Sequence, residues 1–350
     1  MRIVALGGIL AVLAMLGIAV WQIRETPDDL LKGEPPLAGR IPSSRQTVLV
    51  TVLEGESVRD VGERLEEEGV VSSAILFRIM VALEGYEGQL VAGDYELEKG
   101  MPTVQVIDRL HKGITSPLVV TVIEGMRAEE IADIMRREGV VSREAFLEAI
   151  QGSYDFAFLR NKPQSVNLEG YLFPDTYFFG RTTTVEDAVK QMLENFDSKF
   201  SEELRQEADN AGLSLHTVVT LASIVEREAQ VAEERPIIAG VFLRRLSRGI
   251  PLEADPTVQY AVANDPESVA EYGYWKKELT QEDLEIDSAY NTYRRMGLPP
   301  GPICNPGLDS IVAVVRPAQT SYLYFVAKPD GSHAFAETLE EHLANVELYR

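Results

Sequence analysis

The chain has 350 residues, of which 45% are hydrophobic, so it is long enough for two compact units besides its first few dozen residues. Its formal net charge is −22, from 33 basic and 55 acidic residues. Nucleic-acid binding depends on clustered Lys and Arg that neutralise phosphates, so this acidic excess argues against a nucleic-acid partner.

The chain contains few cysteines and histidines. Cys304 is the only cysteine, so no disulfide can form within the chain. The four histidines stand neither beside one another nor beside Cys304 at the spacings that zinc sites use. We therefore expect neither a catalytic metal nor another cofactor.

The chain begins with an apolar segment. Ile3 to Trp21 is a run of nineteen uncharged residues, which as a helix would span about 28 Å, close to the hydrocarbon thickness of a bilayer. Arg2 precedes it and acidic residues from Glu25 onward follow it, which predicts a cytoplasmic N-terminus and a body outside the cytoplasmic membrane. We therefore predict a single-pass transmembrane anchor at residues 1–21. A cleaved signal peptide is the alternative, but the run is long for an h-region and no A-x-A signature closes it.

Residues 22–46 predict a tether. They contain four prolines and the pair Ser43 and Ser44, with little apolar periodicity. Such a segment would let the body sample the space above the membrane.

A repeat follows the tether. The sequence VTVLEGESVRDVGERLEEEGVVS from Val50 recurs as VTVIEGMRAEEIADIMRREGVVS from Val120, with ten identities over the 28 positions 50–77 and 120–147. Each copy predicts a β-branched strand, an E-G turn and an amphipathic helix that ends at Gly69 or Gly139. Common origin and convergence on one strand-turn-helix pattern are both open.

The first copy is part of a small module at residues 47–116. After it, GDYELEKGMPTVQVIDRLHKG predicts a short strand, a turn and a helix ending at Gly113. The order strand-helix-helix-strand resembles LysM glycan-binding modules. A purely structural module is the alternative, since a fold does not by itself define a function.

The second copy, at 119–147, opens a larger domain at residues 117–350. Its short strands and helices show no regular βαβ alternation, so we predict an α+β fold. Leu213 to Ala229 predicts a largely buried helix with Ser214 as its N-cap. Steps of three and four residues along its apolar face reach Glu226.

Glu226 has two interpretations. A carboxyl at the margin of an apolar face is disfavoured in its charged form, which is the condition for a general acid. Alternatively, Glu226 is the solvated end of a core helix, which is the commoner case for charged helix ends.

Three further segments carry candidate site residues. Asn167 to Phe179 (NLEGYLFPDTYFF) combines aromatic rings with carboxylates, a pattern that holds sugars or forms a buried strand and turn. In LEADPTVQY, Asp255 predicts an Asx-type turn and Thr257 a helix start. In AYNTYRRMGLPPGPICNPG, the loop 296–307 is rich in Pro and Gly and predicts a fixed wall of a cleft, or an ordered connector.

The ordered segments LEGYLFPDTY, LASIVEREA, LEADPTVQY, YNTYRRMGLPPGPICNPG and HAFAETLEEH resemble the motifs of the YceG-like (MltG) endolytic murein transglycosylases. The resemblance runs from about residue 119 to 346, and the anchor and LysM-like module extend it over nearly the whole chain. One departure is the stretch between Tyr260 and Leu279, which is longer and more acidic than the family pattern.

This resemblance implies the chemistry. The Glu of the A-S-I-V-E motif, the family's catalytic residue, falls on Glu226. The residues that we expect to bind substrate or line the cleft are Glu169, Tyr171, Asp175, Asp255, Thr257, Tyr290, Asn291, Thr292 and Tyr293.

The sequence therefore predicts a lytic transglycosylase that cuts glycan strands of peptidoglycan endolytically, terminates their elongation and accompanies peptidoglycan synthases. One carboxyl suffices in such an enzyme because the C6 hydroxyl of N-acetylmuramic acid is itself the nucleophile. Two alternatives are a non-catalytic scaffold that binds peptidoglycan and a metal-dependent wall hydrolase, which the scattered histidines disfavour.

Overall fold

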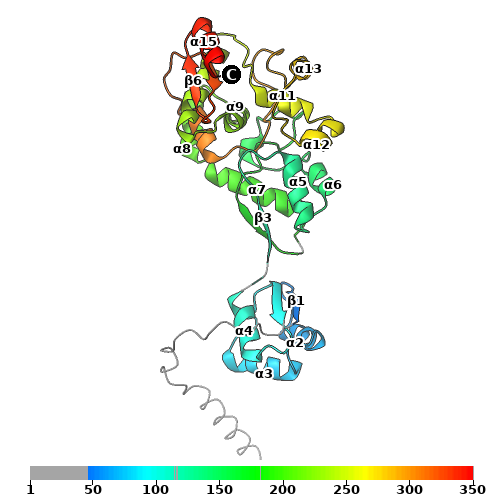
Figure 1. The fold of residues 1–350 in the computed structure, drawn as a ribbon. Coiled ribbons are helices and arrows are strands. Elements are labelled where there is room, and N and C mark those ends of the chain that lie inside the picture. Colours follow the sequence, from blue (N-terminus) through cyan, green and yellow to red (C-terminus); the bar gives the residue numbers. More distant parts are fainter. Residues whose placement is uncertain (1–45, 114, 116, 182, 350) are drawn as a thin grey trace, which may run out of the picture. The chain divides into compact units, whose positions relative to one another are not determined.

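A computed structural model describes residues 46–113, 115, 117–181 and 183–349 of the chain. Within this part the fold is α+β, as predicted, with helices set among three separate antiparallel two-stranded sheets (Figure 1). The predicted anchor at 1–21 and all but the last residue of the predicted tether lie outside the described residues. Among those described, no helix is both long and apolar enough to cross a membrane.

The N-terminal module, residues 47–113, has a hydrophobic core of its own, which includes Leu65, Phe77 and Tyr95. Its two strands pair antiparallel, from Thr47 opposite Glu98 to Val52 opposite Gly93. The elements are, in order, β1 (Thr47–Val52), α2 (Val58–Glu67), α3 (Ala74–Glu84), β2 (Gly93–Glu98) and α4 (Thr103–Lys112).

The C-terminal body, residues 117–349, has a second and larger core. Its elements are β3 (Leu118–Thr121), α5 (Ala128–Arg137), α6 (Arg143–Ala149), η2 (Ala157–Leu159), β4 (Thr176–Phe179), α7 (Val185–Lys199), α8 (Glu202–Asn210), α9 (Leu215–Glu228), η3 (Ala232–Glu234), α10 (Arg235–Ser247), α11 (Asp255–Val262), α12 (Pro266–Tyr272), α13 (Gln281–Leu284), α14 (Leu308–Val315), β5 (Tyr324–Ala327), β6 (His333–Ala336) and α15 (Leu339–Tyr349).

The two repeat copies adopt the predicted strand-turn-helix structure. Helices α2 and α5 occupy positions 58–67 and 128–137, which differ by the 70 residues of the sequence offset. Each helix is followed by its predicted glycine in the left-handed conformation, with φ of 73° at Gly69 and 74° at Gly139. The strands pair with different partners, β1 with β2 and β3 with β4.

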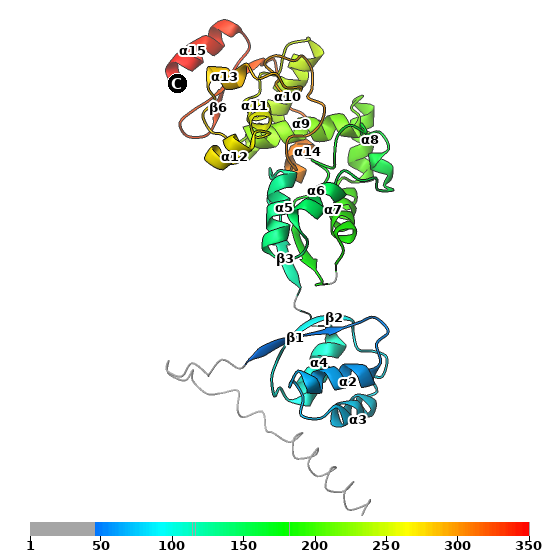
Figure 2. The ribbon, with the colours of Figure 1, turned by 90° about the vertical axis from the view of Figure 1, so that its right-hand side faces the viewer.

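Helix α9 is the buried centre of the C-terminal body. The Ser214 hydroxyl accepts the Thr217 amide at 3.1 Å and so forms the predicted N-cap. Every residue from Val218 to Val225 is buried. Helices α8, α10, α11 and α14 pack around α9 (Figure 1, Figure 2), so the residues at its end are held from several sides.

Replacing Leu65 by Ala tests the core of the N-terminal module. Leu65 is fully buried, so we expect a loss of about 3 kcal/mol in the stability of this module, from lost burial and the remaining cavity. The matched control is Leu83→Ala, because Leu83 is 81% exposed, and it should change stability by less than about 0.5 kcal/mol. Hydrogen exchange of the β1 and β2 amides measures both effects, and equal losses in the two variants would contradict this core.

Candidate active site

Glu226 lies at the end of α9, and its side chain is only 7% exposed. Its Oε2 accepts the backbone N–H of Gly307 at 3.0 Å, and its Oε1 lies 3.6 Å from Nη2 of Arg235 on α10. Gly307 is the N-cap of α14, where unpaired amides favour an acidic group. Glu226 is therefore an enclosed carboxyl fixed by three parts of the chain, and the interpretation as a solvated helix end is wrong.

The buried side chain of Asn305 joins the segments around this carboxyl. Its Oδ1 accepts the amides of Gly170 and Leu172 at 2.8 and 3.0 Å, and its Nδ2 donates to the carbonyl of Met126 at 3.0 Å. Its backbone also pairs with the turn before α5, since its N–H donates to the Met126 carbonyl and its carbonyl accepts the N–H of Gly125. Asn305 was not among the site residues predicted from the sequence. The signal that could have identified it is that it carries the one side-chain amide in the loop 296–307, which is rich in Pro and Gly.

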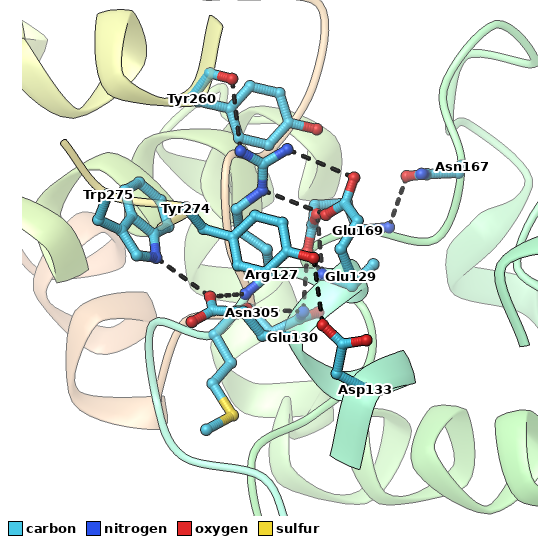
Figure 3. A network of polar contacts seen from close by, with 12 residues as sticks. Arg127, Glu129, Glu130, Asp133, Asn167, Glu169, Tyr260, Tyr274, Trp275 and Asn305 are labelled. Atoms are coloured by element: carbon cyan, nitrogen blue, oxygen red, sulfur yellow. Dashed lines mark hydrogen bonds and ion pairs between the residues drawn. The ribbon is translucent and has the colours of Figure 1, made fainter. Parts of the chain in front are cut away.

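Glu169 belongs to the same network (Figure 3). Its carboxylate accepts the amide of Ala128, at the start of α5, at 3.0 Å and the Nδ2 of Asn305 at 2.9 Å. Burial raises the pKa of Glu169 to about 8, and the nearby Glu129 carboxylate adds to this shift. At 2% exposure Glu169 faces the protein interior, so its contacts are with protein rather than with an open cleft.

Arg127 is a second buried charge beside this network. It is 1% exposed, and its Nε lies 3.1 Å from Glu129. The guanidinium lies between two tyrosine rings, 4.1 Å from the centroid of Tyr260 and 5.4 Å from that of Tyr274 (Figure 3). These stacking contacts stabilise a desolvated guanidinium.

Tyr171 and Asp175 belong to the same segment as Glu169, residues 167–179, but they contact other parts of the chain. Tyr171 is fully buried, its hydroxyl is 2.9 Å from Nδ1 of His216, and burial raises the pKa of this hydroxyl. Asp175 is exposed and accepts the side-chain amide of Asn195 on α7 at 3.0 Å, which lowers the pKa of Asp175. Tyr171 therefore lies in the core and Asp175 lies against α7, whereas the groups that hold Glu226 are Gly307 and Arg235.

The two threonines of the cleft prediction are buried against each other. The hydroxyls of Thr257 and Thr292 are 2.8 Å apart, and the Thr292 hydroxyl also accepts the amide of Ala254 at 3.0 Å. They join the start of α11 to the loop that precedes the Pro- and Gly-rich segment.

Asn291 and Tyr290 shape the same loop. Asn291 is fully buried and donates its side-chain amide to the carbonyls of Leu284 and Ile286, each at 2.9 Å. The half-buried ring of Tyr290 packs on Tyr260, with centroids 4.6 Å apart. Both residues fix the loop through contacts with protein.

Asp255 and Tyr293 face an open groove of about 480 Å³. The Tyr293 hydroxyl donates to Oδ1 of Asp255 at 2.5 Å, and burial together with this carboxylate raises the pKa of Tyr293. The predicted Asx turn is wrong: α11 begins at Asp255 itself, and Ala254 is its N-cap without a side-chain bond. The reason is that Tyr293 engages the carboxylate.

The groove also contains residues that follow Glu226 or come from the closing motif. Arg227 and Glu228 continue α9 into its wall, and His333 lines it from β6. His333 is held by Glu234, with Nδ1 2.7 Å from Oε2. None of these three lining residues was predicted from the sequence to belong to the site.

The acidic stretch that departs from the family pattern packs against Arg227, the residue after Glu226. Trp275 stacks on Arg227, with the guanidinium carbon 3.8 Å from the ring centroid, and its Nε1 donates to Glu130 of α5 at 3.1 Å. This stretch therefore connects α5 with the end of α9. Within the described residues, no group of three or more His, Cys, Asp and Glu is arranged to hold a metal ion.

The fold and the site together define an α+β protein with an enclosed carboxyl at the end of a central helix and a polar, aromatic groove beside it. A family model described as the YceG-like family matches residues 50–348. The chain therefore belongs to the YceG-like family.

Known relatives cover most of the chain. It is 36% identical over 320 residues to a Bacillus subtilis protein named endolytic murein transglycosylase, and the match covers 87% of this chain and 86% of that protein. A Streptococcus pneumoniae protein of the same name is 31% identical over 332 residues, and the chain spans 58% of its length. A crystal structure of a yceG-like protein from Listeria monocytogenes matches with a TM-score of 0.56 and 32% identity, covering 86% of this chain and 99% of that one.

Replacing Asn305 by Ala should destabilise the C-terminal body by about 3 kcal/mol, because it leaves two buried amides and a buried carboxylate without their partner. The exposed Asn210 at the end of α8 provides the control, and Asn210→Ala should cost less than about 0.5 kcal/mol. Urea unfolding measures both, and a wild-type midpoint for Asn305→Ala would exclude the proposed role of this amide.

The raised pKa of Glu169 predicts a pH dependence of stability. Because this pKa rises from its usual value of 4.5 to about 8, the folded protein binds more protons than the unfolded chain between these values. The free energy of unfolding should therefore fall as pH rises through this window, and Glu169→Gln should lose that slope. Urea midpoints across the window test this, with the exposed Glu202→Gln expected to keep the wild-type slope. Identical slopes in wild type and Glu169→Gln would refute the assignment.

Proposed function

We propose that this chain is an endolytic peptidoglycan lytic transglycosylase in which Glu226 is the single acid and base. The observation that carries the proposal is the position of Glu226: a carboxyl 7% exposed, at the end of a buried helix whose next residues line a groove. Membership of the YceG-like family and relatives named endolytic murein transglycosylase support the same activity.

The reaction needs one proton donor that later accepts a proton. Glu226 protonates the oxygen that leaves C1 of N-acetylmuramic acid, and the bond between C1 and this oxygen breaks. The C6 hydroxyl of the same sugar then bonds to C1 and returns its proton to Glu226, which leaves a 1,6-anhydro end. The nucleophile is already part of the substrate, so proximity replaces an activated water and no second acid is required for the bond changes.

The groove supplies the contacts for the glycan. Asp255 and Tyr293 offer polar groups and an aromatic ring in its wall. Arg227, which follows Glu226 on α9, lines the same groove and offers a cationic donor to sugar or stem-peptide oxygens.

Five of the residues that were predicted to line the cleft support its walls from inside the protein: Glu169, Tyr171, Thr257, Asn291 and Thr292. These residues are buried, and their polar groups bond to protein. In the proposed enzyme they position the walls of the groove, while Asp175 and Tyr290 lie at the edges of the segments that carry them.

The predicted anchor and the N-terminal module are consistent with an enzyme that acts on peptidoglycan outside the membrane. We assign residues 1–21 to a single-pass anchor in the cytoplasmic membrane, with the catalytic body outside it, because of the apolar run and its flanking charges. The order β1, α2, α3, β2 and the antiparallel pairing of its strands support a LysM-like module that binds glycan. Together these parts would hold the enzyme where synthases release nascent strands, whose elongation it would terminate.

Replacing Glu226 by Gln tests the proposal. Purified sacculi are digested with the wild type and with Glu226→Gln, and anhydromuropeptides are measured by mass spectrometry. Loss of acid and base catalysis should lower their release by about 100-fold or more. The exposed Glu202→Gln is the matched control and should keep wild-type release.

Three results would contradict the proposal. Wild-type release by Glu226→Gln would remove this residue from the mechanism. Reducing ends without the anhydro ring would make the protein a hydrolase, and binding to sacculi without any release would make it a scaffold. A chelator should leave the activity unchanged.

A further inference from the structure

A second carboxyl, that of Glu124, lies beside Glu226. Glu124 is part of the E-G turn between β3 and α5, and the turn packs against the end of α9. A Cβ built on Gly125 would lie 3.7 Å from Cγ of Glu226 and 3.2 Å from Nη1 of Arg227. Gly125 has a φ of 82°, which a residue with a side chain rarely adopts, so the turn can approach α9 this closely.

Gly307 brings the two carboxyls to one place. Its N–H donates to Glu226, and a Cβ built on it would lie 2.0 Å from Oε1 and 2.7 Å from Oε2 of Glu124. The absence of a side chain at this position therefore makes room for the Glu124 carboxyl. Both acids therefore lie next to Gly307, at the N-terminus of α14.

Acidic and basic side chains around Glu124 have opposite effects on its pKa. Partial burial is the main cause that raises the pKa of Glu124, and the negative charge of Glu226 raises it further. Asp309 on α14 acts in the same direction, whereas Arg235 on α10 opposes it. Arg227 on α9 is the other charged group against the turn. Two ionised carboxylates at this point are therefore disfavoured.

The first repeat copy shows that the turn does not need this contact. Glu54 and Gly55 occupy the equivalent positions in the N-terminal module, with a similar φ of 75° at Gly55. Glu54 and Glu124 are both exposed, but a Cβ on Gly55 would meet no described atom within 4 Å, whereas one on Gly125 would meet Arg227 and Glu226. The two E-G turns therefore differ in what they pack against, and the second packs against the candidate active site.

We propose that Glu124 is a positioning residue that acts through Glu226, the two carboxyls holding one proton between them for transfer to the glycan. This inference rests on the proposed function. Glu124 forms no bond to the glycan: the proton passes from Glu226 to the leaving oxygen and returns from the C6 hydroxyl, as described above. The single negative charge of the pair opposes early loss of that proton to solvent.

The test is the pH dependence of anhydromuropeptide release. In Glu124→Gln the second carboxyl is absent, so the proton should be lost more easily and the alkaline limb of the rate profile should move to lower pH by about one unit. Release near neutral pH should fall about tenfold. Glu124→Asp keeps the charge and should retain the wild-type limb, and the matched Glu54→Gln should behave as wild type throughout.

Gly307→Ala displaces Glu124 without changing it chemically. Its φ of −72° suits any residue, and the added methyl group would occupy the space of a flexible carboxyl end. The alkaline limb should therefore move in the same direction as in Glu124→Gln. Thermal unfolding checks that the variants fold, and if Glu124→Gln does not fold, the Gly307→Ala profile decides in its place.

A wild-type alkaline limb in Glu124→Gln overturns the inference, even if its rate falls, because a purely structural role would lower the rate at every pH alike. Failure of the proposed function has a different signature. In that case Glu226→Gln releases anhydromuropeptides at the wild-type rate, whatever the profile of Glu124→Gln.

Discussion

The structure around the site depends on the requirement that buried polar groups be paired, and the side chain of Asn305 meets this requirement for several segments at once. An amide has one accepting oxygen and two donor hydrogens, and Asn305 uses both kinds: Gly170 and Leu172 donate to it, while Met126 and Glu169 accept from it. Removing any of these partners would leave a desolvated group, which is costly. The E-G turn, the E-G-Y segment and the C-N-P-G loop are therefore fixed relative to one another.

This arrangement gives the two acidic residues beside α14 their positions. Gly307 follows Asn305 by two residues, so the loop that Asn305 fixes also carries the amide that binds Glu226. The turn before α5 is tied to the same loop through Gly125 and Met126, and it carries Glu124. Glu226 itself comes from α9, whose burial on all sides fixes its end. Glu169 is also acidic, but it is buried and stabilises this arrangement by accepting hydrogen bonds from Ala128 and Asn305.

Local sequence signals predicted the elements well. Hydrophobic periodicity, Ser214 as an N-cap and the glycines that end the repeat helices are determined by neighbours in the chain, and the structure has each where it was expected. The position of Glu226 at the margin of the buried face followed from helical spacing alone. Its low exposure did not, because that depends on Gly307 and Arg235, which are distant in sequence.

The site residues whose roles depend on distant contacts were less predictable. Glu169 looked like a cleft residue because acidic and aromatic residues alternate around it, but α5 and Asn305 enclose it. Asp255 was expected to cap a turn, but Tyr293, 38 residues later, engages its carboxylate. Glu124 was visible only as a repeat identity, since nothing in its own segment distinguishes it from Glu54.

A crystal structure of the Glu226→Gln protein with a bound peptidoglycan oligosaccharide would show whether Glu226 reaches the bond that breaks. We expect a glycan in the groove lined by Asp255 and Tyr293, with a glycosidic oxygen within hydrogen-bond distance of residue 226 and the C6 hydroxyl of the adjoining N-acetylmuramic acid directed at C1. A glycan bound on another surface, with residue 226 out of reach of every glycosidic oxygen, would contradict it.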